Sequence, residues 1–259
     1  MKATSSVIII WVFSALLVSC GREKSLFQRM FVGRTGLDFS NRITESETYN
    51  ILNFEYVYNG GGTSVGDFNN DGLQDIFFTG NMVNNEMYLN TGDFRFRKIS
   101  DIAGIKGEDR WCSGSAVVDI NNDGWLDLYV CATTYDPSER RANMLFINQG
   151  VNADNVPVFK ELAEEYGVAD TTHTTTAAFF DYDNDGDLDL VLAVNHMDPR
   201  LHPNAFRKEG DIRLTINADR LYENSFDEDV DRLRKMSRKP TSQDGKKQPG
   251  FKDAGFRYD

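Results

Sequence analysis

Short apolar segments alternate with polar, glycine-containing turns along most of this chain. Met87–Asn90, Leu145–Asn148 and Leu221–Asn224 each run for four residues and end in asparagine. Segments of this length between turn-forming residues are typical of β-strands rather than helices. Residues 94–99 and 158–162 are predicted to form the strands that follow the first two. Phe54 to Tyr58 alternates between apolar and polar positions before three glycines and is predicted to be a strand as well. Strands should therefore dominate, and helices should be few and short.

Three acidic segments of nine residues interrupt this pattern at similar places. Asp67–Asp75, Asp119–Asp127 and Asp181–Asp189 all fit Asp-x-(Asn/Asp)-x-Asp-Gly-x-x-Asp, and their first residues are 52 and then 62 residues apart. Each lies between two strand-like runs, so each is predicted to be the connection of a hairpin. Four short strands in such a period are typical of a propeller blade. The sequence therefore predicts an all-β fold, a partial β-propeller of about three four-stranded blades.

The acidic segments have the donor pattern of a cation-binding loop. Oxygen side chains at positions 1, 3, 5 and 9 and the carbonyl at position 7 can converge on one ion, because glycine at position 6 permits a sharp turn. Calcium accepts about six to eight oxygens at flexible geometry, and no Cys or His, the usual zinc ligands, lies in the loops. We therefore expect about three Ca²⁺ ions, the third loop binding tightest. The predicted ligands are Asp67, Asn69, Asp71, Leu73 and Asp75; Asp119, Asn121, Asp123, Trp125 and Asp127; and Asp181, Asp183, Asp185, Asp187 and Asp189.

Two other interpretations of the loops are less favoured. An EF-hand closes with glutamate at position 12, where this chain has Phe78, Val130 and Leu192. Asn and Asp can also form simple turns at hairpin tips. However, carboxylates held close together repel by roughly 1 to 4 kcal/mol per pair without a cation. Three such loops favour metal binding over simple turns.

The N-terminal residues predict export. Lys2 precedes an apolar run from Val7 to Val18, and Leu17-Val-Ser-Cys20 resembles a bacterial lipobox. The resemblance implies cleavage before Cys20 and a lipid anchor on its sulfur, which gives membrane affinity; an ordinary secretory signal with a chance cysteine is the alternative. The expected location is the bacterial cell envelope, as an outer-membrane lipoprotein. The predicted organisation is a signal peptide at 1–19, a tether at 20–48, a repeat array at 49–225 (49–105, 106–168 and 169–225), and a charged tail or incomplete last strand at 226–259.

Cys112 and Cys131 remain once Cys20 is assigned to the anchor. If a hairpin pairs Asp119 with Asp127, Cys131 lies opposite Ser115 rather than Cys112. Two buried free thiols are therefore favoured over a disulfide.

The loops and the strands around them carry a family resemblance. Val65–Asp75, Val118–Asp127 and Phe180–Asp189 resemble FG-GAP/VCBS repeats, the blades of integrin-alpha-type β-propellers. Residues 50–225 are covered, and the chain resembles in particular exported bacterial VCBS-repeat lipoproteins of the ASPIC/UnbV-associated group. The resemblance implies calcium-stabilised blades and extracellular binding. Propellers close with about four to eight blades, so three units indicate a truncated product or a piece of a longer protein, in preference to assembly of several copies.

Composition and charge narrow the function. The formal net charge of −12 argues against a nucleic-acid partner, which requires clustered Lys and Arg. The expected function is calcium-dependent binding of an extracellular protein or glycan by an envelope-anchored module. The alternative is an accessory or hydrolytic component of polysaccharide processing, with chemistry at His196 and Asp198. No catalytic motif accompanies those residues or the other two histidines, His173 and His202, so no catalytic residue is predicted.

Aromatic residues raise one more possibility. Trp111, Trp125, Tyr56 and Tyr58 could form a platform for stacking sugars. Packing within the core or between blades is the more common role of aromatic residues in strands. We therefore expect packing.

Overall fold

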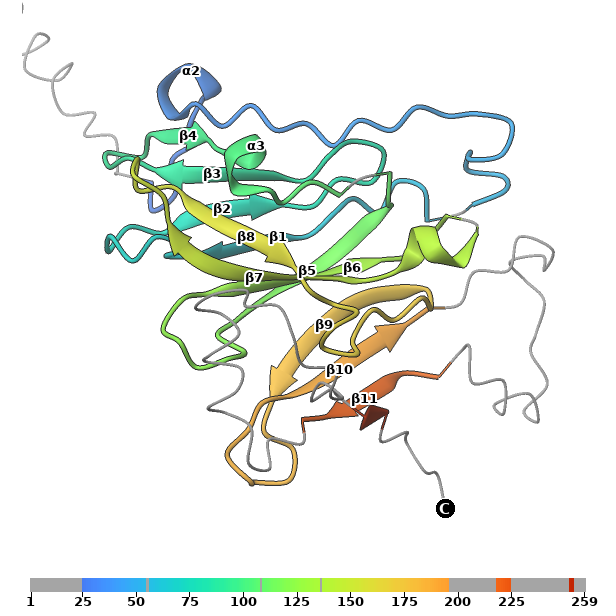
Figure 1. Ribbon diagram of the computed structural model, residues 1–259. Helices are drawn as coiled ribbons and strands as arrows, with labels where there is room; N and C mark the ends of the chain where they lie inside the picture. Colours follow the sequence, from blue (N-terminus) through green and yellow to red (C-terminus); the bar gives the residue numbers. More distant parts are fainter. Residues whose placement is uncertain are drawn as a thin grey trace, which may run out of the picture. The chain divides into compact units, whose positions relative to one another are not determined.

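The computed structural model describes residues 25–54, 56–107, 109–135, 137–195, 218–224 and 252–253. Within these ranges the chain forms three four-stranded antiparallel sheets (Figure 1). The predicted all-β, partial-propeller fold is confirmed. The helices are short, as expected: α2 (Val32–Thr35), α3 (Ser100–Ala103) and the 3-10 helix η1 (Ser138–Arg141). No described helix has the length and apolar character needed to cross a membrane.

The strands of each sheet follow one another in chain order. The first sheet contains β1 (Thr63–Gly66), β2 (Asp75–Phe78), β3 (Glu86–Asn90) and β4 (Phe96–Lys98). The second contains β5 (Cys112–Val118), β6 (Asp127–Ala132), β7 (Met144–Val151) and β8 (Pro157–Glu161). The third contains β9 (Thr174–Phe180), β10 (Asp189–Val194), β11 (Arg220–Glu223) and β12 (Lys252–Asp253). In β12, Asp253 pairs with Tyr222, so residues near the end of the chain join this sheet.

Each acidic loop connects the first two strands of its sheet, as the sequence predicts. The register is the same in all three hairpins, because the residue before the loop pairs with the aspartate at position 9: Gly66 with Asp75, Val118 with Asp127 and Phe180 with Asp189. The expected pairing of Asp119 with Asp127 is therefore wrong by one residue. Ser115 pairs with Val130, and a bulge then places Cys112 opposite Ala132.

Both cysteines are nevertheless free and buried, as predicted. Burial raises the pKa of the Cys112 thiol to about 12, and it also raises the pKa of the Cys131 thiol. The two thiols lie in different apolar clusters.

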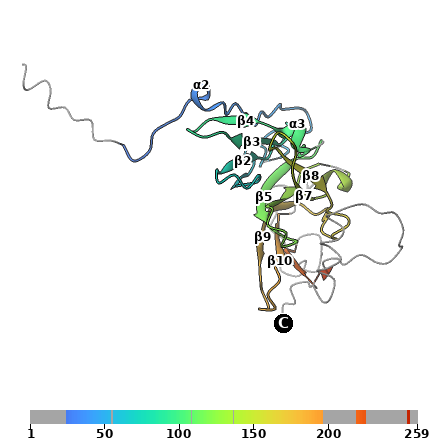
Figure 2. The same cartoon turned by 60° about the vertical axis from the view of Figure 1, so that its left-hand side comes forward.

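The sheets pack face against face through these two clusters. Figures 1 and 2 both show the three sheets arranged side by side in chain order, with the second sheet between the first and the third. The first cluster joins the first and second sheets, and it includes Phe77 and Met87 on one side and Leu128, Val130 and Phe146 on the other. The second joins the second and third sheets, and it includes Tyr129, Cys131, Leu145, Leu190 and Leu192. Strand β6 is buried along its whole length because successive side chains enter different clusters.

The segment before the first sheet does not form the predicted strand. The alternation of Phe54 to Tyr58 suggests a strand, but the described residues of this segment form turns. The Asn50 carbonyl accepts the N–H of Phe54, and the Phe54 carbonyl accepts the N–H of Val57. Phe54 and Val57 are buried beside Trp111 instead of pairing in a sheet.

Two contacts cover part of the outer face of the first sheet. The Phe39 ring stacks on Phe78 with centroids 4.9 Å apart. The Tyr88 hydroxyl donates to Asp38 at 2.6 Å. Residues before the repeat array therefore cover part of the sheet surface that faces away from the second sheet.

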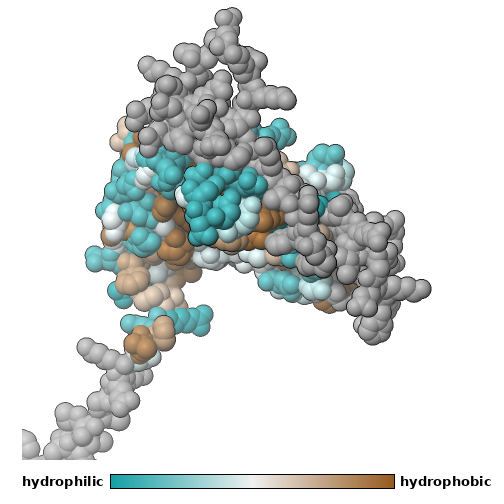
Figure 3. Space-filling view, turned by 90° about the horizontal axis from the view of Figure 1, so that it is seen from below, coloured by the Kyte–Doolittle hydropathy of each residue, from teal (hydrophilic) through white to brown (hydrophobic). Residues whose placement is uncertain are grey.

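The third sheet keeps exposed aromatic side chains on its far side. Tyr182, at position 2 of the third loop, is 39% exposed, whereas the equivalent Phe68 and Ile120 are 0% and 4% exposed because a following sheet covers them. Phe180 is also exposed. Figure 3, seen from below, shows hydrophobic surface among hydrophilic residues on this side of the molecule.

Several predicted features lie outside the described residues. They are the signal peptide at 1–19, Cys20, His196, Asp198, His202 and most of the tail at 226–259.

Candidate metal centres

The three acidic loops share one backbone geometry. Position 4 is an asparagine with a positive φ, between 53° and 64°, and position 6 is a glycine with φ between 86° and 98°. An L-residue with a β-carbon is strained at such a φ, whereas glycine is not. The prediction that glycine makes the sharp turn is confirmed for all three loops.

The aspartate at position 1 organises the turn. In the first loop, the Asp67 carboxylate accepts the N–H groups of Asp71 and Gly72 at 3.0 and 2.8 Å. Asp119 and Asp181 accept the equivalent N–H groups at 2.9 to 3.2 Å. Because each carboxylate oxygen has two lone pairs, these bonds leave acceptor capacity for a cation.

The aspartate at position 9 is buried at the base of each loop. Asp75 and Asp127 are 0% exposed and Asp189 is 1% exposed. The carboxylate of each accepts the N–H of position 2 at 3.0 to 3.1 Å, and its second oxygen accepts the N–H of an asparagine at 2.8 Å. Each of these asparagines belongs to the third strand of its own sheet or lies next to it: Asn90 is the last residue of β3, Asn148 lies within β7, and Asn224 directly follows β11. Position 9 therefore fastens the loop to its own sheet as well as offering ligand oxygens.

Burial makes two of these carboxylates, those of Asp75 and Asp127, hard to ionise when no cation is present. It raises the pKa of Asp75 to about 6 and that of Asp127 to about 8; the two backbone hydrogen bonds oppose the rise, and the other aspartates of the same loop add to it. A divalent ion in the loop would favour the charged form. The electrostatics of the loops therefore fit a cation.

Two further observations test the fit. Asn69, at position 3 of the first loop, is 3% exposed, and its side-chain oxygen is buried without a hydrogen-bond partner while its Nδ2 donates to Asp71 at 2.9 Å. A buried carbonyl oxygen without a donor is unfavourable unless something else satisfies it. In the third loop, Asp181, Asp183 and Asp189 each bring a carboxylate oxygen within 4.8 Å of the others. Oxygen donors alone, without Cys or His, suit a hard cation such as calcium.

The loops differ in how many predicted carboxylates come together. Among the described residues, the third loop holds the acidic group with metal-ligand spacing. The first two loops have asparagine at position 3, and Asn69 and Asn121 each donate Nδ2 to the aspartate at position 5. The position-5 carboxylates accept the N–H of position 7 at 2.9 Å in every loop. Tighter binding at the third loop stays a prediction.

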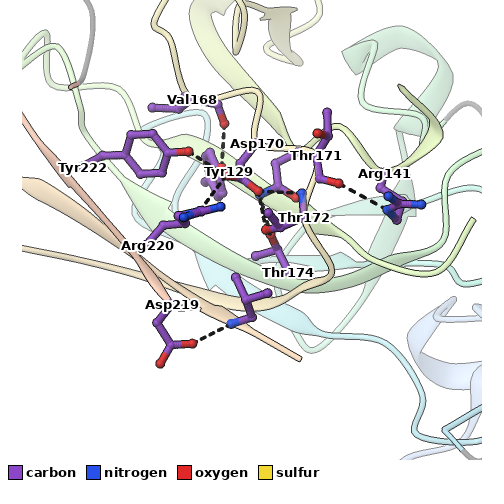
Figure 4. Close-up of polar contacts among 12 residues, drawn as sticks. Tyr129, Arg141, Val168, Asp170, Thr171, Thr172, Thr174, Asp219, Arg220 and Tyr222 are labelled. Carbon is purple, nitrogen blue, oxygen red and sulfur yellow. Dashed lines mark hydrogen bonds and ion pairs between the residues drawn. The ribbon is translucent and has the colours of Figure 1, made fainter. Parts of the chain in front are cut away.

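A second polar cluster lies between the second and third sheets, around Asp170 (Figure 4). Its carboxylate accepts the Tyr222 hydroxyl and the Thr172 N–H, both at 2.7 Å, and lies 3.7 Å from the Arg220 Nε. The Asp170 and Arg220 side chains are only 7% and 15% exposed.

The same cluster extends into the second sheet. The buried Tyr129 hydroxyl donates to the Val168 carbonyl at 2.7 Å and accepts from Asn143, whose Nδ2 also donates to Thr174. The polar groups of this cluster have partners within the protein, so the cluster joins the sheets structurally.

Of the aromatic residues considered for sugar stacking, Trp111 and Tyr56 pack in one cluster, whereas Trp125 lies in the second acidic loop. Trp111 is 3% exposed and packs with Phe54, Tyr56 and the Tyr135 ring. Trp125 is half-buried in the second loop, and Tyr58 is exposed and donates to Glu45. Packing is thus the role of Trp111.

Sequence reasoning missed the asparagines that connect the loops to the sheets. Asn90, Asn148 and Asn224 all donate a backbone N–H to the position-9 aspartate of their sheet. The repeated asparagine at the end of the third apolar segment was the available signal. It marks the point where the third strand meets the loop.

Comparison with known families agrees with this geometry. Residues 67–130 match the model of an FG-GAP-like repeat. The match begins at the first residue of the first loop and includes the whole second loop, and it supports an FG-GAP-type repeat protein. None of the curated proteins searched matches the chain. The narrower likeness to ASPIC/UnbV-associated lipoproteins stays a prediction.

Proposed function

We propose that this chain is a calcium-binding repeat module, anchored in the bacterial cell envelope, that binds an extracellular protein or glycan. The observation that carries the proposal is the threefold recurrence of one oxygen-lined loop geometry. The buried, unpartnered oxygen of Asn69 and the convergent carboxylates of Asp181, Asp183 and Asp189 support a cation in the loops. The FG-GAP-like match is consistent with an extracellular type of module.

In this function the chain's own residues shape each loop before the ion arrives. Position 1 holds the turn through two backbone N–H groups, and position 9 ties the loop to the third strand. A bound divalent ion would neutralise the clustered carboxylates, which carry much of the net charge of −12. The loops would then hold their sheets in fixed positions, and the sheet surfaces would present the binding site for the partner.

Calorimetric titration of the chelator-stripped protein with CaCl₂ tests the metal assignment. We expect about three ions per chain for the wild type. The triple variant Asp67→Asn, Asp119→Asn, Asp181→Asn keeps the side-chain shape at position 1 but loses one charge per loop, and it should bind calcium far more weakly. A wild-type protein that takes up no calcium would refute the proposal.

The anchor needs its own experiment. Expression of the full chain in a bacterium with labelled palmitate should give a labelled protein in the membrane fraction, and Cys20→Ala should abolish the label. A wild-type protein that is exported without the label would leave calcium binding in place but reject the anchor. Binding to arrayed glycans or to surface proteins, compared with and without chelator, then tests the partner class.

A further inference from the structure

The first and second loops are connected by hydrogen bonds that link their ligand positions. Asn148 makes the buried connection. Its Nδ2 donates to the Phe68 carbonyl of the first loop at 2.9 Å, and its backbone N–H donates to the Asp127 carboxylate of the second loop at 2.8 Å. Asn148 is 1% exposed. One buried residue therefore contacts position 2 of one loop and position 9 of the next.

A second connection runs over the surface. Asn70, which lies between the predicted ligands Asn69 and Asp71, donates Nδ2 to the Gly124 carbonyl of the second loop at 3.0 Å. Gly124 lies between Asp123 and Trp125, the predicted ligands at positions 5 and 7. Since this bond is exposed to water, it should contribute less than the buried bond of Asn148.

The equivalent residues elsewhere make no such connection. Among the described residues, Asn90 and Asn224 donate Nδ2 only within their own sheets, to Gln74 and Leu188. The asparagines at position 4 of the other loops, Asn122 and Asn184, form no side-chain hydrogen bond within the described residues. Within the described part of the chain, direct hydrogen bonds to a neighbouring loop are thus found for the first pair alone.

We propose that the first and second loops bind calcium cooperatively, whereas the third loop binds it independently. This inference rests on the proposed calcium function and adds a regulatory property to it. Ordering of the first loop by an ion fixes Phe68 and Asn70, which in turn hold Asn148 and Gly124 in the positions that the second loop needs. The second ion then meets a loop that is already ordered, so less conformational entropy is lost on binding. By linkage, the second loop favours the first to the same extent.

Trp125 provides a local reporter because it lies inside the second loop. In a Trp11→Phe, Trp111→Phe background, which leaves Trp125 as the one tryptophan of the chain, its fluorescence is followed during titration of the chelator-stripped protein with CaCl₂. Disabling the first loop by Asp67→Asn should move the Trp125 midpoint to a calcium concentration at least about fivefold higher. Disabling the third loop by Asp181→Asn should leave the midpoint unchanged.

A matched pair of variants separates the hydrogen bond from the ligands. Asn70→Gly removes the surface bond but no ligand, and glycine accepts the φ of 55° found there; it should raise the Trp125 midpoint by about twofold, since an exposed bond contributes little. Asn184→Gly makes the same change in the third loop, where φ is 64°, and should have no effect. Circular dichroism in saturating calcium checks that every variant is folded.

The outcomes distinguish the two levels of the proposal. If Trp125 and calorimetry both show no calcium binding by the wild type, the calcium function itself fails. If calcium binds but Asp67→Asn leaves the Trp125 midpoint in place, the loops are independent and the cooperative inference fails. An equal shift in Asp67→Asn and Asp181→Asn would also overturn it, because the effect would not follow the hydrogen bonds.

Discussion

Both joints between sheets have hydrogen bonds away from the acidic loops, such as the one between the Ser64 and Ser115 hydroxyls in the first joint. Within the described residues, the joint between the first and second sheets also has hydrogen bonds at the loops themselves, and the joint between the second and third sheets does not. In the first joint, Asn148 and Asn70 connect one acidic loop to the next, beside the core that contains Phe68 and Cys112. In the second joint, hydrogen bonds between the sheets gather around Asp170, away from the loops, beside the core that contains Cys131.

This difference indicates that the stability of two similar apolar interfaces can depend on different conditions. The first joint includes groups whose geometry a cation would fix, so its stability should depend on calcium. The second joint is held by a carboxylate, a guanidinium and hydroxyls that already satisfy one another. Its stability should depend on those side chains more than on calcium.

The largest effect on stability is expected from removing a buried side chain in the first joint. Phe68→Ala removes a fully buried ring that packs against Phe159 with centroids 6.1 Å apart. Loss of a buried phenylalanine lowers the free energy of unfolding by about 3 to 5 kcal/mol. Urea denaturation measures this change. Tyr182→Ala, at the same loop position but in a side chain that is 39% exposed, is the control and should have a much smaller effect; equal losses would contradict the assigned packing.

A slightly smaller effect is expected from breaking the second joint. Asp170→Ala removes the carboxylate that lies 3.7 Å from the Arg220 Nε and accepts the Tyr222 hydroxyl. Removing one partner of a buried ion pair costs about 3 to 5 kcal/mol; we expect about 3, because Arg220 keeps some contact with water. Thermal denaturation in calcium measures the loss, and alkylation of Cys131 should accelerate more than that of Cys112.

Asp101→Ala is the control for this variant. Asp101 pairs with Lys106 at 2.6 Å, but its side chain is 79% exposed. Water and salt screen such a pair, so no measurable loss of stability is expected. A loss as large as that of Asp170→Ala would show that the buried cluster has no special role.

The sequence predicts the parts of this molecule that depend on local pattern. The acidic loops, the strands on either side of them and the burial of both thiols follow from residue types and spacing within about ten positions. The hairpin register does not, because it depends on how the turn closes: Val118, not Asp119, pairs with Asp127. A single-residue shift of this kind leaves the hydrophobic pattern of the loop itself unchanged.

The contacts that distinguish the two joints could not be predicted, because they join distant parts of the chain. Asn148 contacts Phe68 across 80 residues, and Tyr222 contacts Asp170 across 52. An asparagine at a strand end and an aspartate between repeats look ordinary in sequence. For the same reason, the alternation of Phe54 to Tyr58 was a poor guide, since packing on Trp111 replaced strand pairing there.

Removing calcium should destabilise the first joint more than the second. Each site that binds the folded state stabilises it by about 2.7 kcal/mol when calcium is a hundredfold above the dissociation constant, so chelator should lower the melting temperature. Buried thiols react slowly because the thiolate is the reactive form and burial raises its pKa. With chelator, alkylation of Cys112 should therefore accelerate first, while Cys131 stays protected.

Mass spectrometry of the alkylated peptides follows each cysteine separately, so Cys20 does not interfere. Magnesium added in place of calcium is the control and should restore little protection, because it demands a stricter geometry. Simultaneous exposure of both thiols would mean that the joints open as one unit, and the contrast between them would have to be given up.

The smallest effect is expected from a single hydroxyl in the second joint. Tyr129→Phe keeps the ring, which is 0% exposed, but leaves the Val168 carbonyl without its donor and Asn143 without one acceptor. Loss of a buried hydrogen bond with its partners left in place costs about 1 to 2 kcal/mol. The same loss should be found in calcium and in chelator, because no loop residue takes part. Tyr58→Phe removes the exposed hydrogen bond to Glu45 and should leave stability unchanged in both conditions. If Tyr129→Phe lowered stability only in calcium, the stability of the second joint would depend on the loops.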